Sequence, residues 1–115
     1  MQLPKPHEAE IQKQVMQYLW AIGAFAIRIN SGAFAGSHNG KKRFVRFNSE
    51  PGTSDILAIL PNGRFAAFEV KRPGWKRPSG EREEKQAAFL AEVRRRGGVA
   101  AFVTGVDDVV KELET

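Results

Sequence analysis

The fold is decided by one stretch of the chain, residues 55–71, which reads DILAILPNGRFAAFEVK. Two apolar runs, residues 55–60 and 64–71, flank a Pro-Asn-Gly turn. Gly63 supplies the positive φ angle that a tight hairpin needs, so the two runs are predicted to form paired strands. Because the runs are almost continuously apolar, both strands are expected to be buried on both faces of a sheet.

Three charged side chains lie within this hairpin. Folding the chain about its turn brings Asp55 opposite Glu69 or Val70. Glu69 and Lys71 occupy alternate positions and therefore share one face of their strand. Charges in a buried strand are costly unless they are paired or bound to a metal, and a hard cation such as Mg²⁺ takes oxygen ligands. The arrangement is typical of a metal-dependent nuclease; the alternative is a solvated sheet face on which the lysine is a cross-strand partner of the carboxylates.

Composition narrows the class of protein. A chain of 115 residues is the size of one domain, residues 1–115, and 42% of its residues are apolar. It has no apolar run long enough for a membrane span and no apolar signal segment, so we expect a cytoplasmic protein. The lack of cysteine excludes disulfides and thiolate sites, and two histidines are too few for a zinc site. Eighteen Lys and Arg against thirteen Asp and Glu favour a polyanionic partner such as nucleic acid.

Helical and alternating apolar patterns surround the hairpin. The predicted elements are, in order, a helix over residues 7–22, strands over 24–30 and 43–48, the two strands of the central hairpin, a helix over 81–96, a strand over 99–104 and a helix over 107–113. Residues 31–40 are predicted to be a glycine-rich loop that joins the first two strands into a basic hairpin. The order α-β-β-β-β-α-β-α predicts an α/β sandwich, with helices flanking a central mixed sheet.

Two polar residues lie on the apolar faces of the predicted helices. Glu8 is on the sheet-facing side of the first helix, whereas Glu10 is on the other side. Glu8 either satisfies free N–H groups at the helix start or supplies another oxygen to a metal site. Gln86 shares the core face of the second long helix and must find hydrogen-bond partners there. It either orients Lys71 or a nucleophilic water, or it bonds to backbone.

Several of these motifs resemble known nuclease families. Gly52-Thr53-Ser54-Asp55, followed by Glu69-Val70-Lys71, resembles the PD-(D/E)xK nuclease superfamily, although serine precedes the aspartate where proline is usual. Three further features resemble the virus-type replication-repair nuclease (VRR-NUC) family of that superfamily: the Glu8 helix, the run Arg28-Ile29-Asn30-Ser31-Gly32, and Gln86 followed by Phe89-Leu90. The resemblance covers about residues 7–103 and implies a restriction-endonuclease-like fold.

The resemblance also implies an activity and a set of roles. The activity is that of a Mg²⁺- or Mn²⁺-dependent endonuclease that cuts branched DNA as Holliday junction resolvases do, and that works as a homodimer. Asp55, Glu69 and the Val70 carbonyl would bind the metal, with Glu8 at its water shell, while Lys71 positions the nucleophile and Gln86 assists. The choice of Glu8 over Glu10, and of one or two metal ions, stays open. The alternatives are a flap or nick-directed nuclease and a non-catalytic DNA-binding module on the same fold.

Basic side chains near the predicted site are expected to neutralise DNA phosphates without reading sequence. The expected DNA-binding residues are Arg28, Asn30, Lys41, Lys42, Arg43, Arg46, Arg72, Trp75, Lys76 and Arg77. Trp75 either stacks on an exposed base or packs on the sheet edge as an anchor for its loop. Apolar residues in the loop and the basic hairpin, namely Phe34, Phe44, Val45 and Phe47, either form a dimer interface or complete the core.

Overall fold

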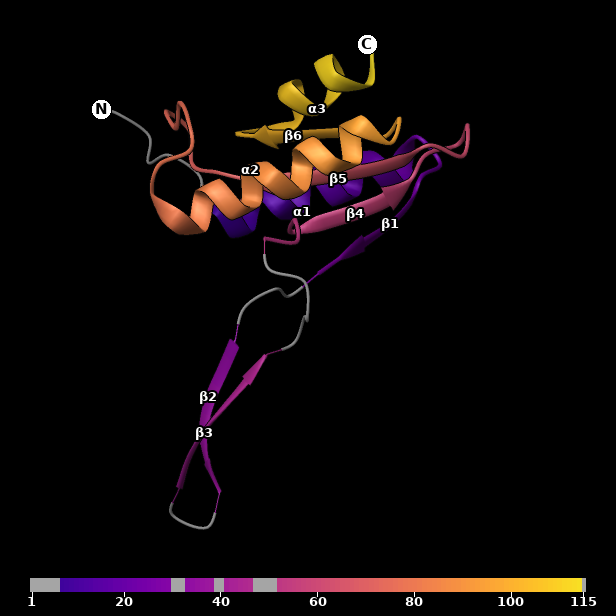
Figure 1. The fold of residues 1–115 in the computed structure, drawn as a ribbon. Helices are drawn as coiled ribbons and strands as arrows, with labels where there is room; N and C mark the ends of the chain where they lie inside the picture. The colour runs from indigo at the N-terminus through magenta and orange to yellow at the C-terminus, as the bar shows by residue number, and fades with distance from the viewer. Residues whose placement is uncertain (1–6, 30–32, 39–40, 47–51, 115) are drawn as a thin grey trace, which may run out of the picture.

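A mixed sheet of four strands forms the centre of the domain in the computed structural model, which describes residues 7–29, 33–38, 41–46 and 52–114 (Figure 1). Its strands, in spatial order, are β1 (Phe25–Arg28), β4 (Ile56–Ile59), β5 (Phe65–Val70) and β6 (Val99–Val103). The first three pair antiparallel, and β5 pairs parallel with β6. The predicted mixed sheet is therefore confirmed.

The predicted central hairpin is the pair β4 and β5. Gly63 has a φ angle of 87°, and the Arg64 N–H donates to the side-chain oxygen of Asn62 at 3.0 Å. This turn fixes a register in which Ile56 lies opposite Phe68. One step further along the pair, Asp55 lies beside Glu69.

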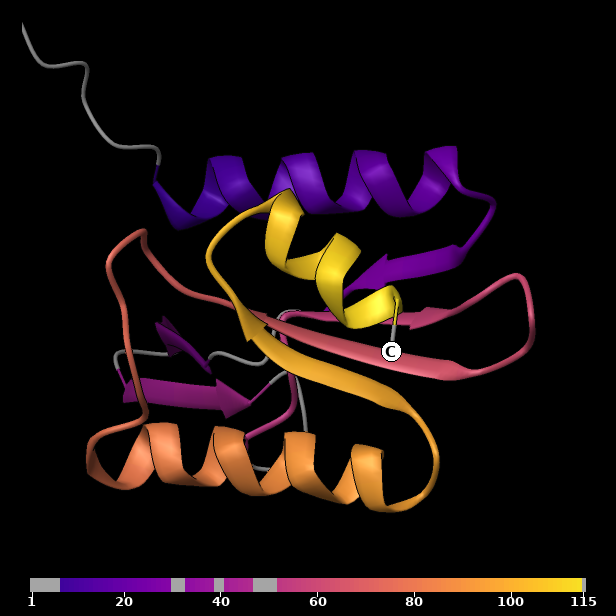
Figure 2. The ribbon, with the colours of Figure 1, turned by 90° about the horizontal axis from the view of Figure 1, so that it is seen from above.

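Helices cover the two faces of the sheet unequally. One face is covered by α1 (Glu8–Ala21), with α3 (Val106–Leu113) packed beside it, and the other by α2 (Gly80–Arg95) (Figure 2). The larger core lies under α1 and includes Phe68 and Val70 of β5. Ala67 packs instead in a smaller cluster with α2. Because side chains alternate along a strand, Glu69 and Lys71 share the α2 face with Ala67.

The sequence prediction missed one strand. Residues 33–38 form β2 (Ala33–His38), which pairs antiparallel with β3 (Lys41–Arg46) in a separate two-stranded sheet that extends away from the α/β body (Figure 1). The prediction of a loop over residues 31–40 was therefore wrong, and so was the pairing of the first two predicted strands. β2 reads AFAGSH, which lacks the β-branched residues that identify strands. β1 pairs with β4 instead, and this brings Ala26 beside Ala58 in the larger core.

None of the helices in the described ranges is long and apolar enough to cross a membrane.

Candidate active site

Asp55 and Glu69 hold each other in place at the end of the central hairpin. The Asp55 N–H donates to Glu69 Oε2 at 3.1 Å, and the Val70 N–H donates to Asp55 Oδ2 at 2.9 Å. Each carboxylate thus accepts a backbone hydrogen bond from the strand of the other. This reciprocal arrangement fixes both acidic side chains to rigid strands rather than to a loop.

Glu69 is only 3% exposed, at the base of the site. Burial raises the pKa of its carboxyl to about 8, with a further contribution from the negative charge of Asp55 and a smaller opposing one from Lys71. A buried carboxylate that meets a second, half-buried one is costly to ionise while the second is charged. The pair therefore favours either a bound proton or a bound cation at neutral pH.

The donor set of this pair fits a hard divalent cation. Asp55 and Glu69 supply carboxylate oxygens from adjacent strands. The Val70 carbonyl lies on the same edge of β5 as its N–H, which bonds to Asp55, because the two groups of one strand residue point the same way. Magnesium is commonly held by one or two carboxylates and keeps several waters, so three protein oxygens suffice. Among the described residues, no three acidic or histidine side chains gather into a larger cluster.

Gln86 joins the acidic pair to Lys71. Its Nε2 donates to Glu69 Oε1 at 3.0 Å, and its Oε1 accepts from the Lys71 ammonium at 2.8 Å. Gln86 and Lys71 are 5% and 7% exposed, so this chain of hydrogen bonds is shielded from solvent. Of the two alternatives for Gln86, the contact with Lys71 is the one present in the structure. The site is a continuous network across β4, β5 and α2.

Comparisons with known proteins identify the fold that carries this network. A solved structure described as a "VRR_NUC domain" matches with a TM-score of 0.59 and 25% sequence identity, over 93% of this chain and 94% of that chain. This chain has the VRR-NUC fold. The family resemblance and the restriction-endonuclease-like architecture are thus confirmed, and the match indicates a nuclease domain. No model of a known protein family matches the chain, and no curated protein matches it.

Glu8 lies on α1 and not on the strands or the helix that carry the network. It is the first residue of α1 and is half-buried, whereas Glu10 is exposed. Since α1 covers the opposite face of the sheet from Glu69, the structure does not gather Glu8 with the acidic pair into a three-residue cluster among the described residues. The assignment of Glu8 to the metal's water shell stays a prediction.

Glu83 is a member of the network that the sequence prediction missed. Its carboxylate lies 3.0 Å from the Lys71 ammonium and accepts a hydrogen bond from the Ser79 N–H, also at 3.0 Å. The Trp75 ring nitrogen donates to the same carboxylate at 3.3 Å. In the sequence, Glu83 resembles any other acidic residue in the first turn of a helix, so no local signal identified it.

Trp75 packs against the domain rather than standing free. Its ring lies 4.5 Å from the ring of Phe102 on β6, centroid to centroid, with an angle of 36° between the planes. With its ring nitrogen bonded to Glu83, Trp75 is half-buried. The structure therefore favours the interpretation of Trp75 as a loop anchor over that of a free stacking platform.

Gly52 allows the segment that precedes β4 to approach α2 closely. Its φ angle is 80°, and a Cβ atom at this position would lie 2.4 Å from the backbone oxygen of Lys85. Only glycine fits such a contact with helix backbone. Three residues further on, the Asp55 N–H donates to one oxygen of Glu69, while Gln86 Nε2 donates to the other.

The predicted DNA-binding residues fall into two groups. Arg28 at the end of β1 and Arg72, Lys76 and Arg77 in the loop after β5 are exposed. Lys41, Lys42, Arg43 and Arg46 lie on β3, where the structure describes the backbone but not the side chains; the same holds for Phe34, Phe44 and Val45. Asn30 and Phe47 lie outside the described residues.

Proposed function

We propose that this domain is a divalent-metal-dependent DNA endonuclease that hydrolyses phosphodiester bonds in branched DNA. The observation that carries the proposal is the network in which half-buried Asp55 joins the buried side chains of Glu69, Gln86 and Lys71 on one face of a VRR-NUC fold. The VRR-NUC resemblance implies Mg²⁺ or Mn²⁺ as the cofactor. The raised pKa of Glu69 supports this choice, because a bound cation offsets the burial of this carboxylate and its repulsion by half-buried Asp55.

The chain's own residues then have defined tasks. Asp55, Glu69 and the Val70 carbonyl would hold the metal, which when bound would supply an activated water and neutralise charge on the phosphate. Gln86 fixes the Lys71 ammonium relative to Glu69 by bonding to both. An ammonium held in this way can donate a hydrogen bond to the attacking water or to a phosphate oxygen. Because these groups sit on strands and a helix, little reorganisation is needed during the reaction.

Charge supports DNA as the substrate. The net charge is +5, and exposed basic residues lie near the site at Arg28, Arg72, Lys76 and Arg77. Such contacts bind phosphates without selecting bases, so recognition rests on DNA shape. The VRR-NUC resemblance, rather than this charge, implies branched DNA, including four-way junctions, as the substrate class.

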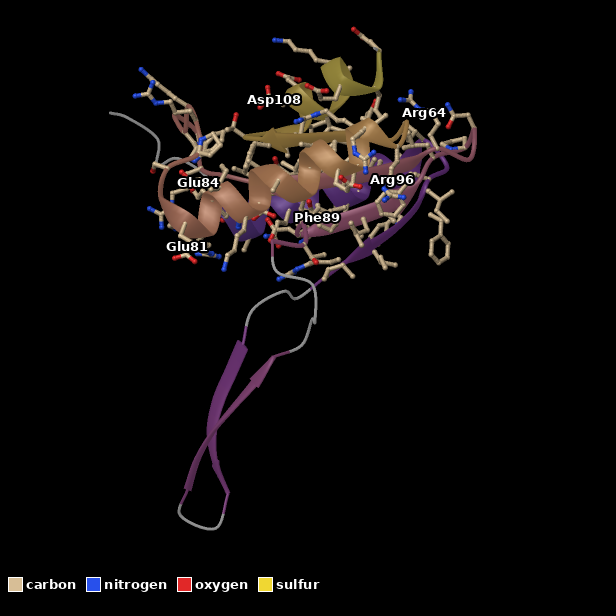
Figure 3. The ribbon with its side chains drawn as sticks, in the orientation of Figure 1. Arg64, Glu81, Glu84, Phe89, Arg96 and Asp108 are labelled. Atoms are coloured by element: carbon tan, nitrogen blue, oxygen red, sulfur yellow. The ribbon has the colours of Figure 1, made fainter. Side chains whose placement is uncertain are left out.

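We further propose that the domain works as a homodimer through an exposed apolar row on the α2 side of the sheet. Phe25, Ile59 and Phe65 are adjacent on three strands and are 69%, 50% and 43% exposed. A pocket along α2 continues the row and is lined by Phe65, Phe89 and Val93 with the charged residues Lys85, Glu92 and Arg96. Figure 3 labels Phe89 and Arg96 on this side of the molecule. Charges of both signs suit a two-fold contact with a second copy, in which each surface faces its own equivalent. If this surface bound only DNA, the charged residues around the apolar row would all be basic.

A cleavage panel tests the activity and the substrate together. The purified domain is incubated with four-way junctions, flaps, nicked duplexes and linear duplexes, with and without Mg²⁺. Metal-dependent cleavage that is fastest on junctions is the expected result. Binding without cleavage of any substrate in Mg²⁺ or Mn²⁺ would contradict the proposal and leave a non-catalytic DNA-binding module.

Light scattering at micromolar concentration tests the homodimer. The wild-type chain should have twice the mass of the 12.8 kDa monomer, and Phe25→Asp should reduce it to the monomer mass. A wild-type monomer that stays monomeric on junction DNA would contradict paired cutting and favour a flap or nick-directed nuclease.

A further inference from the structure

Glu83 connects three parts of the domain that meet at the start of α2. Its carboxylate contacts the Lys71 ammonium at the end of β5, the Ser79 N–H before the helix, and the Trp75 ring nitrogen in the loop between them. It lies one helical turn before Gln86, so both side chains reach the lysine from the same face of α2.

We propose that Glu83 is a positioning residue that holds Lys71 in its reactive direction and couples it to the loop of residues 72–79. The role of Lys71 in this proposal rests on the proposed function. The contacts that make Glu83 a junction between lysine and loop are independent of it.

Burial explains why Lys71 needs this partner. The lysine side chain is 9% exposed, and an ammonium that has lost its water requires both charge compensation and hydrogen-bond acceptors. Gln86 offers a neutral oxygen at 2.8 Å, and Glu83 offers an anionic one at 3.0 Å. The bond to Lys71, followed by that to the Ser79 N–H, lowers the pKa of Glu83, so this carboxylate is charged at neutral pH.

The two acceptors, Glu83 and Gln86, also fix the direction in which the Lys71 ammonium points. Lysine has a flexible four-carbon stem, so a single contact leaves its ammonium free to swing. Glu83 and Gln86 hold it from adjacent turns of one rigid helix. Without Glu83, the ammonium would still be attracted to Glu69, to which Gln86 connects it, and an ammonium drawn to that carboxylate would compete with a metal ion.

The same carboxylate extends the connection to the DNA-binding loop. Trp75 stacks on Phe102 and donates to Glu83, which fixes the middle of a loop whose exposed residues include Arg72, Lys76 and Arg77. A phosphate contact that shifts this loop would therefore shift Glu83 and, through it, Lys71. The coupling runs through contiguous contacts at every step.

Glu81 provides a matched control on the same helix. It is also an acidic residue of the first turn, but its side chain is 85% exposed and forms an ion pair with Lys85 at 3.3 Å rather than with Lys71. Glu81→Gln and Glu83→Gln change the charge near the helix start equally, and only the second removes an anion from Lys71. Trp75→Phe provides a second comparison, since it keeps a ring to stack on Phe102 and removes the N–H donor.

The test measures single-turnover cleavage of a four-way DNA junction in Mg²⁺ at saturating enzyme, together with junction affinity in metal-free buffer. Glu83→Gln should slow cleavage by roughly 10²-fold, the typical cost of a small misplacement of a reacting group, with affinity nearly unchanged. Glu81→Gln should cleave at the wild-type rate, and Trp75→Phe should fall between the two. Adding Glu83→Gln to Lys71→Ala should cause no further loss, because both changes remove the same interaction.

A spectroscopic measurement separates this proposal from the proposed function. In metal-free protein, the ammonium group of Lys71 should give a slowly exchanging NMR signal that Lys71→Ala removes. Glu83→Gln should abolish or shift that signal and Glu81→Gln should leave it unchanged, whether or not the protein cleaves DNA. An unchanged signal in Glu83→Gln, or wild-type cleavage by that variant, would overturn the proposal. Absence of cleavage by the wild type with a Glu83-dependent signal would overturn only the catalytic part.

Discussion

The two faces of β5 perform opposite tasks with alternate residues of one strand. On the α1 face, Ala66, Phe68 and Val70 are at most 1% exposed and belong to the larger apolar core. On the α2 face, Glu69 and Lys71 are almost as deeply buried but are charged. The polar face is possible because α2 supplies Gln86 and Glu83 as partners for these charges. A buried strand can therefore carry a reactive site when a single facing helix satisfies its polar groups.

The two faces also differ in how completely they are covered. α1 buries four apolar side chains against the sheet, namely Ile11, Val15, Met16 and Leu19. α2 buries only Gln86 and Leu90, and it leaves the apolar row of Phe25, Ile59 and Phe65 exposed on the same side. We expect the α1 face to determine stability and the α2 face to determine activity and assembly.

Removal of the Phe68 ring should disrupt the apolar packing of the α1 face and lower stability. Phe68→Ala should lower the free energy of unfolding by about 3–5 kcal/mol, through lost apolar burial and the cavity that remains. Phe65→Ala, three positions away on the same strand but 43% exposed, should cost far less. Urea denaturation of both variants measures the difference. Equal losses would show that the two faces contribute alike to stability.

Removal of Lys71 from the α2 face should reduce catalysis without unfolding the domain. Lys71→Ala should reduce single-turnover cleavage by about 10²–10³-fold, the usual cost of one oriented group that acts in the transition state, with little change in DNA affinity. Lys76→Ala removes an exposed lysine that we assign to a DNA contact, so it should weaken junction binding but leave the single-turnover rate at saturating enzyme almost unchanged. A Lys71→Ala variant with the wild-type rate would mean that the lysine is only a structural partner of the carboxylates.

A methyl group at Gly52 should push the segment before β4 away from α2. Gly52→Ala should destabilise the domain by about 1–3 kcal/mol and slow cleavage, because its Cβ would collide with the backbone of α2. Gly63→Ala is the control, since Gly63 has a similar φ angle of 87° and open space around it. Chemical denaturation should show a larger loss for Gly52→Ala than for Gly63→Ala. Equal losses would mean that backbone strain alone, and not the approach of α2, explains the effect.

The acidic pair should make metal-free stability depend on pH. The raised pKa of Glu69, at about 8, means that the folded protein keeps a proton which the unfolded chain releases near its ordinary, lower pKa. Stability should therefore fall as pH rises through the window between those two pKa values. Mg²⁺ should raise the melting temperature at pH 8 and have little effect near pH 5, where the proton competes with it. Thermal melts at both pH values, with and without Mg²⁺, measure this, and a pH-independent effect of Mg²⁺ would contradict it.

The central hairpin and its two carboxylates were predictable because short-range rules determine them. A Pro-Asn-Gly turn fixes the register, and the register places Asp55 beside Glu69. Gln86 could be singled out because an amide on an apolar helix face must find partners. Its partner Lys71 is in fact bonded to it.

Other features depend on tertiary contacts that leave no local pattern. In the sequence, Glu83 looks like a common acidic residue at a helix start. Its role depends on Lys71, which α2 meets where it packs on the sheet. The exposure of Phe25 and Ile59 depends on which strands α2 covers, and an apolar pattern alone does not determine this. β2 has weak strand propensity and forms through pairing with β3.

The central claim is that the acidic pair on the α2 face holds a catalytic metal, and Asp55→Asn tests it most directly. The asparagine is nearly isosteric and can still accept the hydrogen bond from the Val70 N–H, so the fold should be retained. Junction cleavage and junction binding are measured for the wild type and the variant over a series of Mg²⁺ concentrations. The account predicts that cleavage by the variant is abolished at every Mg²⁺ concentration while binding persists or tightens. Cleavage by Asp55→Asn at the wild-type rate and with the wild-type Mg²⁺ dependence would contradict it.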